Sequence, residues 1–205
     1  MTIEVKKSLK PVAFQEAINV LEDRVHDVYN GKKRELLWIL EHRAVYTAGT
    51  SAKKNEIIDK KINVIKTNRG GKVTYHGPGQ KIVYFVLNLN KREKDIRKLI
   101  TNLENCIIDI LNVYKIKSHR DAKNIGIWVI SGNRTKKIAA IGIRVKKWIA
   151  YHGFSLNVCN DLEKYKKIIP CGIKEKGVTS LKKLGKNKFK DIDEIIINKF
   201  LDIFV

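Results

Sequence analysis

A segment from residue 69 to residue 80 combines glycines with side chains that can do chemistry. It reads RGGKVTYHGPGQ, so that Arg69, His76 and Gln80 stand among four glycines and a proline. Glycines let a backbone approach a ligand closely and present N–H groups to an anion or a polarised carbonyl, and Arg69 and His76 add donors. A tight turn would explain two of the glycines but not the polar side chains. The segment therefore predicts a binding loop.

A cysteine stands between a proline and a glycine at Pro170-Cys171-Gly172. A thiol attacks as its thiolate, and a nearby cation lowers its pKa. The sequence does not say which cation is near in space, and a single cysteine is more often a small buried hydrophobic residue than a nucleophile. Both interpretations stay open on this segment alone. For Cys106 and Cys159 the buried, unreactive interpretation fits better.

Lys137 begins an apolar stretch of small and branched residues. A lysine there is either a solvated strand end or a partly desolvated ammonium that faces a pocket lined by Ala139 and Ile141. The small side chains favour the pocket. His152, in the next expected strand, either lines the same cleft or is a buried core histidine, and His42 follows another buried strand at a position that could border the cleft.

Hydrophobic periodicity indicates the elements that must position these side chains. Spacing of three and four residues predicts helices over 12–30, 95–114 and 192–204. Apolar runs rich in β-branched and aromatic residues predict strands over 36–40, 63–67, 82–89, 125–130, 137–145 and 149–158. The strands cluster in the middle of the chain and the helices flank them. We therefore expect an α/β (α+β) fold, a mixed β-sheet covered by helices.

Length and composition are those of one soluble domain. With 205 residues, 43% of them hydrophobic, the chain can bury one sizeable core, so we expect a single domain over 1–205. No apolar run approaches the roughly 18 residues of a membrane span, and residues 1–10 lack the apolar stretch of a signal peptide. Three widely spaced cysteines suit a reducing compartment. We expect a cytoplasmic protein with no membrane partner.

A formal charge of +21, from 42 basic and 21 acidic residues, would attract an anionic partner. Nucleic acid, anionic lipid and an acidic protein are all candidates, and nucleotide bias in the genome explains the same composition. A nucleic-acid-binding module would leave the glycine-rich segment and Cys171 without a role. Its tryptophans, Trp38, Trp128 and Trp148, form no evident platform for stacking bases. We therefore expect no nucleic-acid partner.

Five segments, taken in order, resemble the lipoyl(octanoyl) transferase family of lipoate biosynthesis. They are HRAVYTAGTSA at 42–52, RGGKVTYHGPGQ at 69–80, KIAAIGIRV at 137–145, YHGFSLNV at 151–158, and IPCGI at 169–173 followed by GVTSL at 177–181. Together they extend over most of the chain. The resemblance implies a fold like the catalytic domain of biotin- and lipoate-protein ligases, with a mixed sheet and flanking helices.

The resemblance also implies roles for individual residues. Cys171 is the nucleophile that forms an acyl-thioester enzyme, and Lys137, which directly precedes the Ile-Ala pair, lowers the pKa of that cysteine. The segments that bind the acyl substrate correspond to Arg69, Gly70, Gly71, Lys72, Val73, Thr74, Tyr75, His76, Ala140, Ile141, Gly142, Gly153, Phe154 and Ser155.

The activity implied by the resemblance is the first step of endogenous protein lipoylation. An octanoyl group would pass from octanoyl-acyl carrier protein to the lipoyl-domain lysine of 2-oxo-acid dehydrogenase complexes and of the glycine cleavage H protein. No cofactor or metal is expected, because thioester exchange is nearly balanced and amide formation is downhill. The alternative is an ATP-dependent lipoate- or biotin-protein ligase, which shares the fold but forms an adenylate and needs no thiol. Cys171 together with Lys137 favours the transferase.

Overall fold

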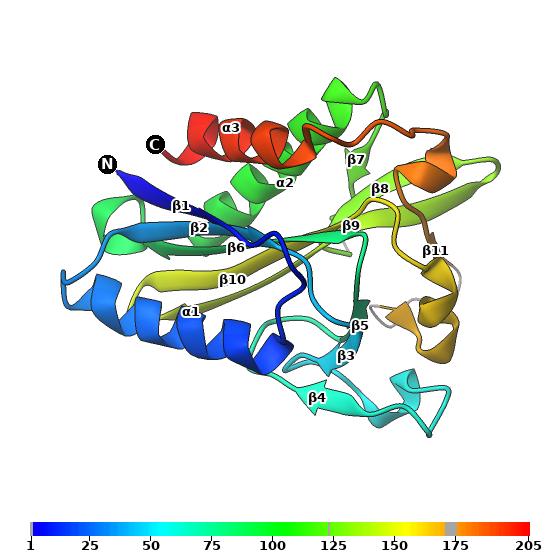
Figure 1. Cartoon of the computed structure of the whole chain (residues 1–205), viewed down its shortest axis with the longest axis horizontal. Coiled ribbons are helices and arrows are strands. Elements are labelled where there is room, and N and C mark those ends of the chain that lie inside the picture. Colours follow the sequence, from blue (N-terminus) through cyan, green and yellow to red (C-terminus); the bar gives the residue numbers. More distant parts are fainter. Residues whose placement is uncertain (1, 123, 171–175) are drawn as a thin grey trace.

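A mixed β-sheet crosses the molecule between helices (Figure 1). The computed structural model describes residues 2–122, 124–170 and 176–205, and within them the sheet has eight strands. Their order is β1 (Ile3–Lys7), β2 (Glu35–Leu40), β6 (Gln80–Asn88), β10 (Ile149–Asn157), β9 (Arg134–Lys146), β8 (Ile127–Ser131) and β7 (His119–Arg120), with β11 (Gly177–Val178) beside β9. The pairs β1–β2 and β11–β9 are parallel and the others antiparallel, which confirms the predicted mixed sheet.

Helices cover both faces of this sheet. α1 (Phe14–Tyr29) lies on one face, and α2 (Ile96–Val113) and α3 (Ile192–Phe204) lie on the other (Figure 1). Strand β2 shows why its sequence is apolar throughout. Leu36 and Trp38 point into the core under α1, whereas Leu37 and Ile39 point into the core under α2 and α3. Successive side chains of a strand alternate between faces, so a strand covered on both sides must be apolar at every position.

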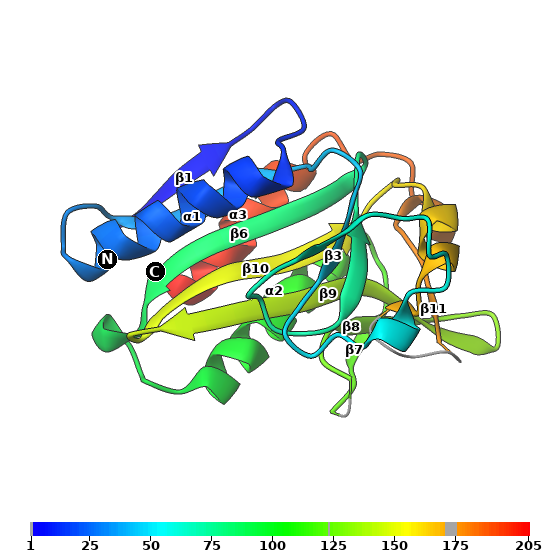
Figure 2. The same cartoon turned by 90° about the horizontal axis from the view of Figure 1, so that it is seen from below.

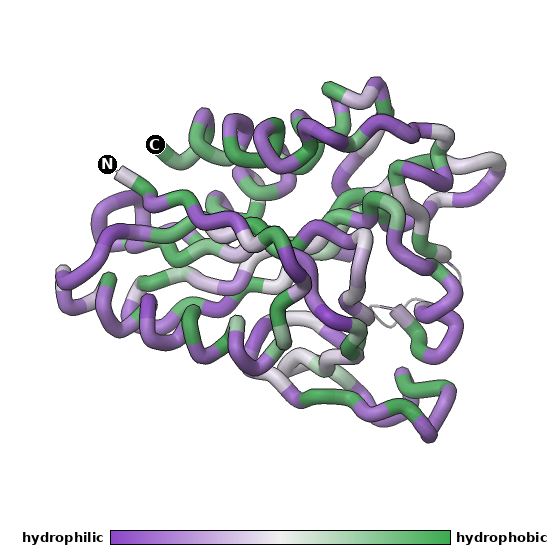
Figure 3. The backbone as a smooth tube through the Cα atoms, viewed as in Figure 1, coloured by the Kyte–Doolittle hydropathy of each residue, from purple (hydrophilic) through white to green (hydrophobic). Residues whose placement is uncertain are grey.

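The three helices lie where periodicity predicts them. Hydrophilic and hydrophobic residues alternate within the turns of α1 and α3 (Figure 3), as expected for helices with one apolar face. In α3 the buried face carries Ile192, Ile196 and Phe200, spaced by four residues. No helix in the described part of the chain is long and apolar enough to cross a membrane.

A second, smaller sheet lies on the same side of the main sheet as α1 (Figures 1 and 2). Its order is β4 (Val64–Lys66), β3 (Val45–Ala48) and β5 (Val73–His76). Short 3-10 helices complete the structure: η1 (Lys54–Glu56), η2 (Leu89–Lys91), η3 (Leu162–Lys167) and η5 (Lys182–Leu184). The expectation of one continuous loop over 69–80 is therefore wrong in part. Its middle is β5, in which alternating β-branched and aromatic residues pair with β3.

Candidate active site

The beginning of the glycine-rich segment lies against β9. The backbone N–H of Gly70 donates to the Ile143 carbonyl at 3.0 Å. Gly142, beside Ile143, makes this approach possible, because a Cβ there would stand only 3.1 Å from the Gly70 oxygen. Gly49 serves the same purpose on the other side, where a Cβ would stand 2.4 Å from the Gly71 oxygen. Backbones from three parts of the sequence therefore meet without intervening side chains.

Arg69 uses its guanidinium to hold this loop in place. Its Nη atoms donate to the carbonyl oxygens of Thr47 at 3.1 Å, Gly70 at 2.9 Å and Lys72 at 2.9 Å, and to the Thr47 hydroxyl at 2.8 Å. From its sequence context, Arg69 is expected to offer donors to a ligand. In the structure these Nη donors are bonded to the protein, so the contribution of Arg69 is the shape of the loop.

A small cavity of about 60 Å³, here called the inner cavity, lies between this loop and strands β9 and β10. It is lined by Arg69, Gly71, Lys72, Thr74, His76, Ile82, Tyr84, Ala140, Ile141, Gly142, His152, Gly153, Phe154 and Ser155. The expected substrate-binding residues thus gather around one space from three distant segments. Gly70, Val73 and Tyr75 do not line it. Because side chains of β5 alternate, Val73 and Tyr75 face a separate apolar cluster with Tyr165.

A chain of buried hydrogen bonds begins at His76, on the lining of the inner cavity, and continues away from it through Gln80. His76 Nδ1 contacts Gln80 Oε1 at 2.7 Å, and Gln80 Nε2 donates to Asn157 Oδ1 and to the Tyr165 hydroxyl, both at 2.8 Å. Burial, with the nearby His42 and Arg69, lowers the pKa of His76 to about 3. The imidazole is therefore neutral at neutral pH, and its Nδ1 carries the proton given to Gln80.

The other two candidate histidines, His42 and His152, are both buried, but only His152 lines the inner cavity. His42 does not line the inner cavity, because its ring bonds to the Val12 carbonyl at 3.0 Å and to the Tyr84 hydroxyl at 2.8 Å. The expectation that it borders the cleft is wrong. His152 lines the cavity and is also buried, with Nε2 at 2.8 Å from Asn68 Oδ1. His152 therefore lines a cavity and is buried, but it is not a fully satisfied core histidine, because its Nδ1 has no hydrogen-bond partner among the described residues.

Lys137 is buried, not a solvated strand end. Its side chain is 6% exposed, and its Nζ donates to the Ile125 carbonyl at 3.0 Å and lies 4.6 Å from the ring centroid of Trp128. Lys176 reaches the same ring at 4.7 Å but forms an ion pair with Asp121 at 2.6 Å. Among the residues that the structure describes, no carboxylate pairs with Lys137. Its positive charge therefore stays available to an anion.

Lys137 lines a narrow space of its own, the lysine cavity, which adjoins the inner cavity. Thr74, Ala140 and Ser155 line both of them. The remaining lining consists of Trp128, Lys137, Ala139, Asn157, Tyr165, Pro170, Lys176, Gly177 and Val178. Ala139 and Ile141 are both expected in one pocket with Lys137. Ala139 lines the lysine cavity, but Ile141 lines the inner cavity instead.

The expected nucleophile, Cys171, lies outside the described residues. Pro170 and Lys176, which flank the undescribed segment in the sequence, both line the lysine cavity. Of the other cysteines, Cys106 is buried in α2, and burial raises its pKa to about 12. Cys159 is exposed, so the expectation that it is a buried residue is wrong, because the chain has left β10 two residues earlier.

Sequence reasoning missed four side chains of this site: Trp128, Asn157, Tyr165 and Lys176. A signal existed for Asn157, because it follows Ser155 by two residues on the same strand and so shares its face. Nothing in the local sequence indicates that the η3 residue Tyr165 reaches Gln80, since 85 positions separate them.

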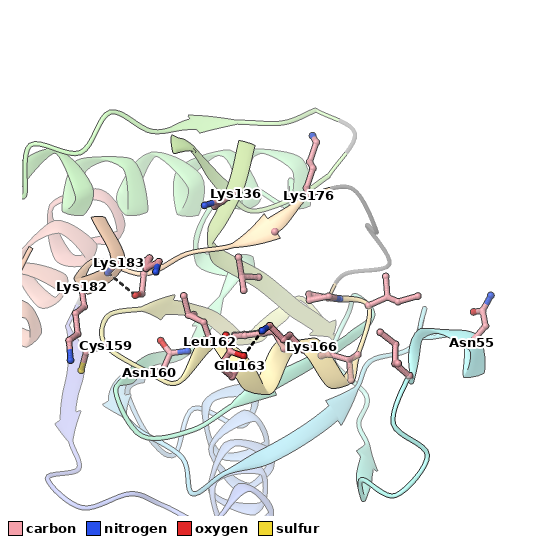
Figure 4. A pocket seen from close by; sticks show the side chains of 18 residues that line it. Asn55, Lys136, Cys159, Asn160, Leu162, Glu163, Lys166, Lys176, Lys182 and Lys183 are labelled. Carbon is pink, nitrogen blue, oxygen red and sulfur yellow. Dashed lines mark hydrogen bonds and ion pairs between the residues drawn. The ribbon is translucent and has the colours of Figure 1, made fainter. Parts of the chain in front are cut away.

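A larger opening, the basic cleft, begins at the lysine cavity and has a volume of about 1040 Å³ (Figure 4). Tyr165, Pro170, Lys176, Gly177 and Val178 line both spaces. The rest of its lining is Asn55, Ile58, Lys136, Cys159, Asn160, Leu162, Glu163, Lys166, Ile168, Ile169, Ser180, Lys182 and Lys183. The lysine cavity therefore adjoins two other spaces, the small inner cavity and the large basic cleft, and shares lining residues with each of them.

Solved structures with the same fold define the fold class of the chain. A bi-partite lipoate protein ligase from Thermoplasma acidophilum superimposes with a TM-score of 0.73 over 98% of this chain and 84% of its own, at 15% identity. A lipoate-protein ligase A bound with ATP gives 0.72, at 14% identity, over 98% and 85%. A biotin protein ligase from Aquifex aeolicus gives 0.58, at 14% identity, over 98% and 69%. The fold is that of a lipoate- and biotin-protein ligase catalytic domain.

Sequence similarity identifies the family to which the chain belongs within this class. Residues 14–202 match the model of the lipoyl protein ligase A/B catalytic domain. An octanoyltransferase of Ehrlichia chaffeensis is 47% identical over 98% of this chain and 96% of its own length, and one of Anaplasma phagocytophilum is 44% identical over the whole of both. The chain belongs to the lipoyl protein ligase A/B catalytic domain family and, within it, to the octanoyltransferases. It is an acyltransferase of protein lipoylation.

Proposed function

We propose that this enzyme takes the octanoyl group from octanoyl-acyl carrier protein onto Cys171 and passes it to the lysine of a lipoyl domain. Acceptors would be the 2-oxo-acid dehydrogenase complexes and the glycine cleavage H protein. Lys137 carries the proposal: a buried ammonium with no carboxylate partner in the described part of the chain, in a cavity lined by Pro170 and Lys176. These two residues precede and follow the segment that contains Cys171.

The first half of the reaction exchanges one thioester for another. The Cys171 thiolate attacks the octanoyl carbonyl carbon, a C–S bond forms, and the carbonyl becomes a tetrahedral oxyanion. When the oxyanion collapses, the bond to the phosphopantetheine sulfur breaks, and the departing thiolate takes up the proton that Cys171 lost. Lys137 favours the attacking thiolate, because an adjacent positive charge lowers the pKa of a thiol.

In the second half, the uncharged amine of the lipoyl-domain lysine attacks the octanoyl-cysteine thioester. A C–N bond forms, the C–S bond to Cys171 breaks, and the proton lost by the amine returns to the cysteine sulfur. The amide is more stable than the thioester, so transfer proceeds without nucleotide hydrolysis. Lys137 would hold the thiolate leaving group by the same charge that favoured its formation.

The inner cavity would receive the acyl chain. Its lining joins the apolar side chains of Ile82, Ile141 and Phe154 to small residues of β9 and β10. Gly153 is needed for the strand pairing itself, because a Cβ there would stand 1.9 Å from the Val83 oxygen. An aliphatic chain gains stability from contact with these apolar side chains, which supports this cavity as the octanoyl site.

Intact mass spectrometry of the protein with octanoyl-acyl carrier protein and without ATP tests the proposal. We expect an octanoyl adduct that hydroxylamine removes, present in the wild type and absent in Cys171→Ala. Lys137→Ala should form it more slowly, while Lys146→Ala, an exposed lysine on the same strand, should react like the wild type. Cys159→Ala should also react like the wild type, which excludes an adduct on the exposed cysteine.

The alternative, an ATP-dependent ligase, predicts the opposite pattern. No adduct would form in any sample, and lipoyl-domain modification would appear only with ATP and free octanoate. That result would overturn the thioester mechanism. Relatives named octanoyltransferase at 44 and 47% identity support transfer over ligation, since the ligases of known structure are only 14 and 15% identical.

A further inference from the structure

The basic cleft carries an excess of cations that the described protein does not neutralise. Of the five lysines on its lining, Lys166 pairs with Glu163 at 2.5 Å and Lys176 with Asp121 at 2.6 Å. Lys136, Lys182 and Lys183 have no ion pair within residues 2–122, 124–170 and 176–205. Lys182 and Lys183 belong to η5 and are exposed to solvent. This part of the cleft therefore fits an anion.

Asn160 adds an independent sign of a ligand. The residue is 5% exposed and lines the cleft, and its Oδ1 and Nδ2, both buried, have no hydrogen-bond partner among the residues that the structure describes. Burying an amide without partners is unfavourable, so such a group in a rigid site is expected to be satisfied by what binds there. The backbone at Asn160 packs closely against Gly79, where a Cβ would stand only 2.8 Å from the Asn160 nitrogen. The neighbouring Cys159 N–H donates to the Gly79 carbonyl at 2.9 Å, and these contacts hold the backbone in place.

These groups follow an order along the cleft. Lys176, which also lines the lysine cavity, lies at one end of the view in Figure 4, whereas Asn160 and Lys182 lie at the other. Between them in that view lie Leu162, Glu163 and Lys166. Outward from the proposed reaction centre, a ligand would thus meet apolar and charged side chains, then the end of the cleft that carries Asn160 and the exposed ammonium groups of η5.

We propose that the basic cleft holds the phosphopantetheine arm of the acyl donor. This inference rests on the proposed function, which brings a thioester to the lysine cavity. The arm carries, in order from its sulfur, two amides and a phosphodiester. Asn160 would turn its buried amide toward an amide of the arm, and Lys182 and Lys183 would pair with the phosphodiester, as lysine does with phosphates elsewhere. The source of the arm is the acidic carrier protein, whose surface the lysines around the cleft would also attract.

A series of octanoyl thioesters separates these contacts. The thioester of mercaptoethanol has neither amide nor phosphate, that of pantetheine has the amides, and that of 4′-phosphopantetheine has both. The rate constant kcat/KM for enzyme acylation is measured by mass spectrometry for each donor, for octanoyl-coenzyme A and for octanoyl-acyl carrier protein. No acceptor is needed, so only the first half of the reaction is observed.

Lys182→Ala/Lys183→Ala should lower kcat/KM for the phosphopantetheine and carrier-protein donors by about three- to tenfold more than for the pantetheine donor, since two exposed charge contacts are lost. The control is Lys32→Ala/Lys146→Ala, which removes two exposed lysines, one in the connection from α1 to β2 and one at the end of β9. The α1–β2 connection and the β9–β10 turn lie at the end of the molecule away from β11 and η3 (Figure 1). Equal losses for the two donors, or the same pattern in the control, would overturn the assignment of these lysines.

Asn160→Leu, a change of similar volume, should reduce acylation by the pantetheine donor more than acylation by the mercaptoethanol donor. Asn160→Ala serves if thermal unfolding shows that the leucine variant is unstable. A loss of equal size with both donors would overturn the amide contact.

Octanoyl-coenzyme A reacting as well as the carrier-protein donor would overturn the carrier protein as the source. A wild type that no thioester acylates contradicts the proposed function itself, which is a different result from any of these.

Discussion

Lys137 owes its position to Gly126, which directly precedes the neighbouring strand β8. Gly126 has a φ of +124°, and a Cβ there would lie 2.7 Å from the Ala139 oxygen and 3.3 Å from Lys137 Nζ. The bare backbone at Gly126 lets the lysine side chain lie flat against Ile125, whose carbonyl oxygen accepts its hydrogen bond. At the scale of single residues, the proposed catalytic geometry thus depends on a missing side chain as much as on the charge.

Gly126→Ala should therefore slow enzyme acylation without abolishing the fold. The added methyl group must displace Lys137 Nζ, and a misplaced group in an acylation site lowers the rate by at least about tenfold. Single-turnover acylation followed by mass spectrometry measures the effect. Gly132→Ala is the control, since Gly132 also has a positive φ, +61°, but nothing lies within 4 Å of its Cβ position. Equal rates in the two variants would contradict this role of Gly126.

Helices α2 and α3 cover the same face of the sheet but begin differently. Asp95, the N-cap of α2, accepts hydrogen bonds from the backbone N–H groups of Arg97 at 2.8 Å and Lys98 at 3.0 Å. Asp191, the N-cap of α3, makes no such bond through its side chain. The same residue type at equivalent positions therefore satisfies unpaired N–H groups in one helix and not in the other.

Asp95→Ala should lower the free energy of unfolding by about 1 kcal/mol, the usual effect of removing an N-cap. Asp191→Ala should have a much smaller effect, because no cap hydrogen bond is lost. Urea unfolding of the two variants beside the wild type measures both changes. Acylation rates should stay at the wild-type level in each, since neither residue lines the cavities around Lys137. A larger loss for Asp191→Ala than for Asp95→Ala would show that the caps do not explain stability here.

Three buried histidines couple the stability of the whole molecule to pH. Burial lowers the pKa of His42 to about 4, and lowers the pKa values of His76 and His152 to about 3. In the unfolded chain the same rings titrate near 6.5. Between about pH 6.5 and 4 the unfolded chain binds protons that the folded protein does not, so folding becomes less favourable as the pH falls.

The free energy of unfolding should accordingly decrease between pH 7 and pH 5, by up to about 1.4 kcal/mol per pH unit for each histidine. His152→Gln removes one titrating group and should make the decrease shallower by about a third. His119→Gln, an exposed histidine on β7, should leave the slope as it is, because that ring meets water in both states. Urea unfolding at a series of pH values provides the measurement, and a stability that is flat from pH 7 to pH 5 would contradict the prediction.

Elements with a strong periodic pattern were predictable along the chain. The expected helix 192–204 coincides with α3, and the expected helices 12–30 and 95–114 exceed α1 and α2 by one or two residues at each end. Strands β1, β3, β5, β7 and β11 were not expected. They have five residues or fewer, and four of them lie at a sheet edge or off its main path, where pairing with a distant partner matters more than local pattern.

For the site, sequence alone determined which residues are unusual, and tertiary structure decided what they do. Glycines, Lys137 and Cys171 stand out because their chemistry fits poorly with a plain core or surface. Three features depend on contacts between distant segments. Arg69 bonds to backbone carbonyls. Among the described residues, Lys137 is buried without a carboxylate partner and the side chain of Asn160 has no hydrogen-bond partner. Local sequence carries side-chain chemistry and periodicity; burial and hydrogen-bond partners arise only when the chain folds and brings those segments together.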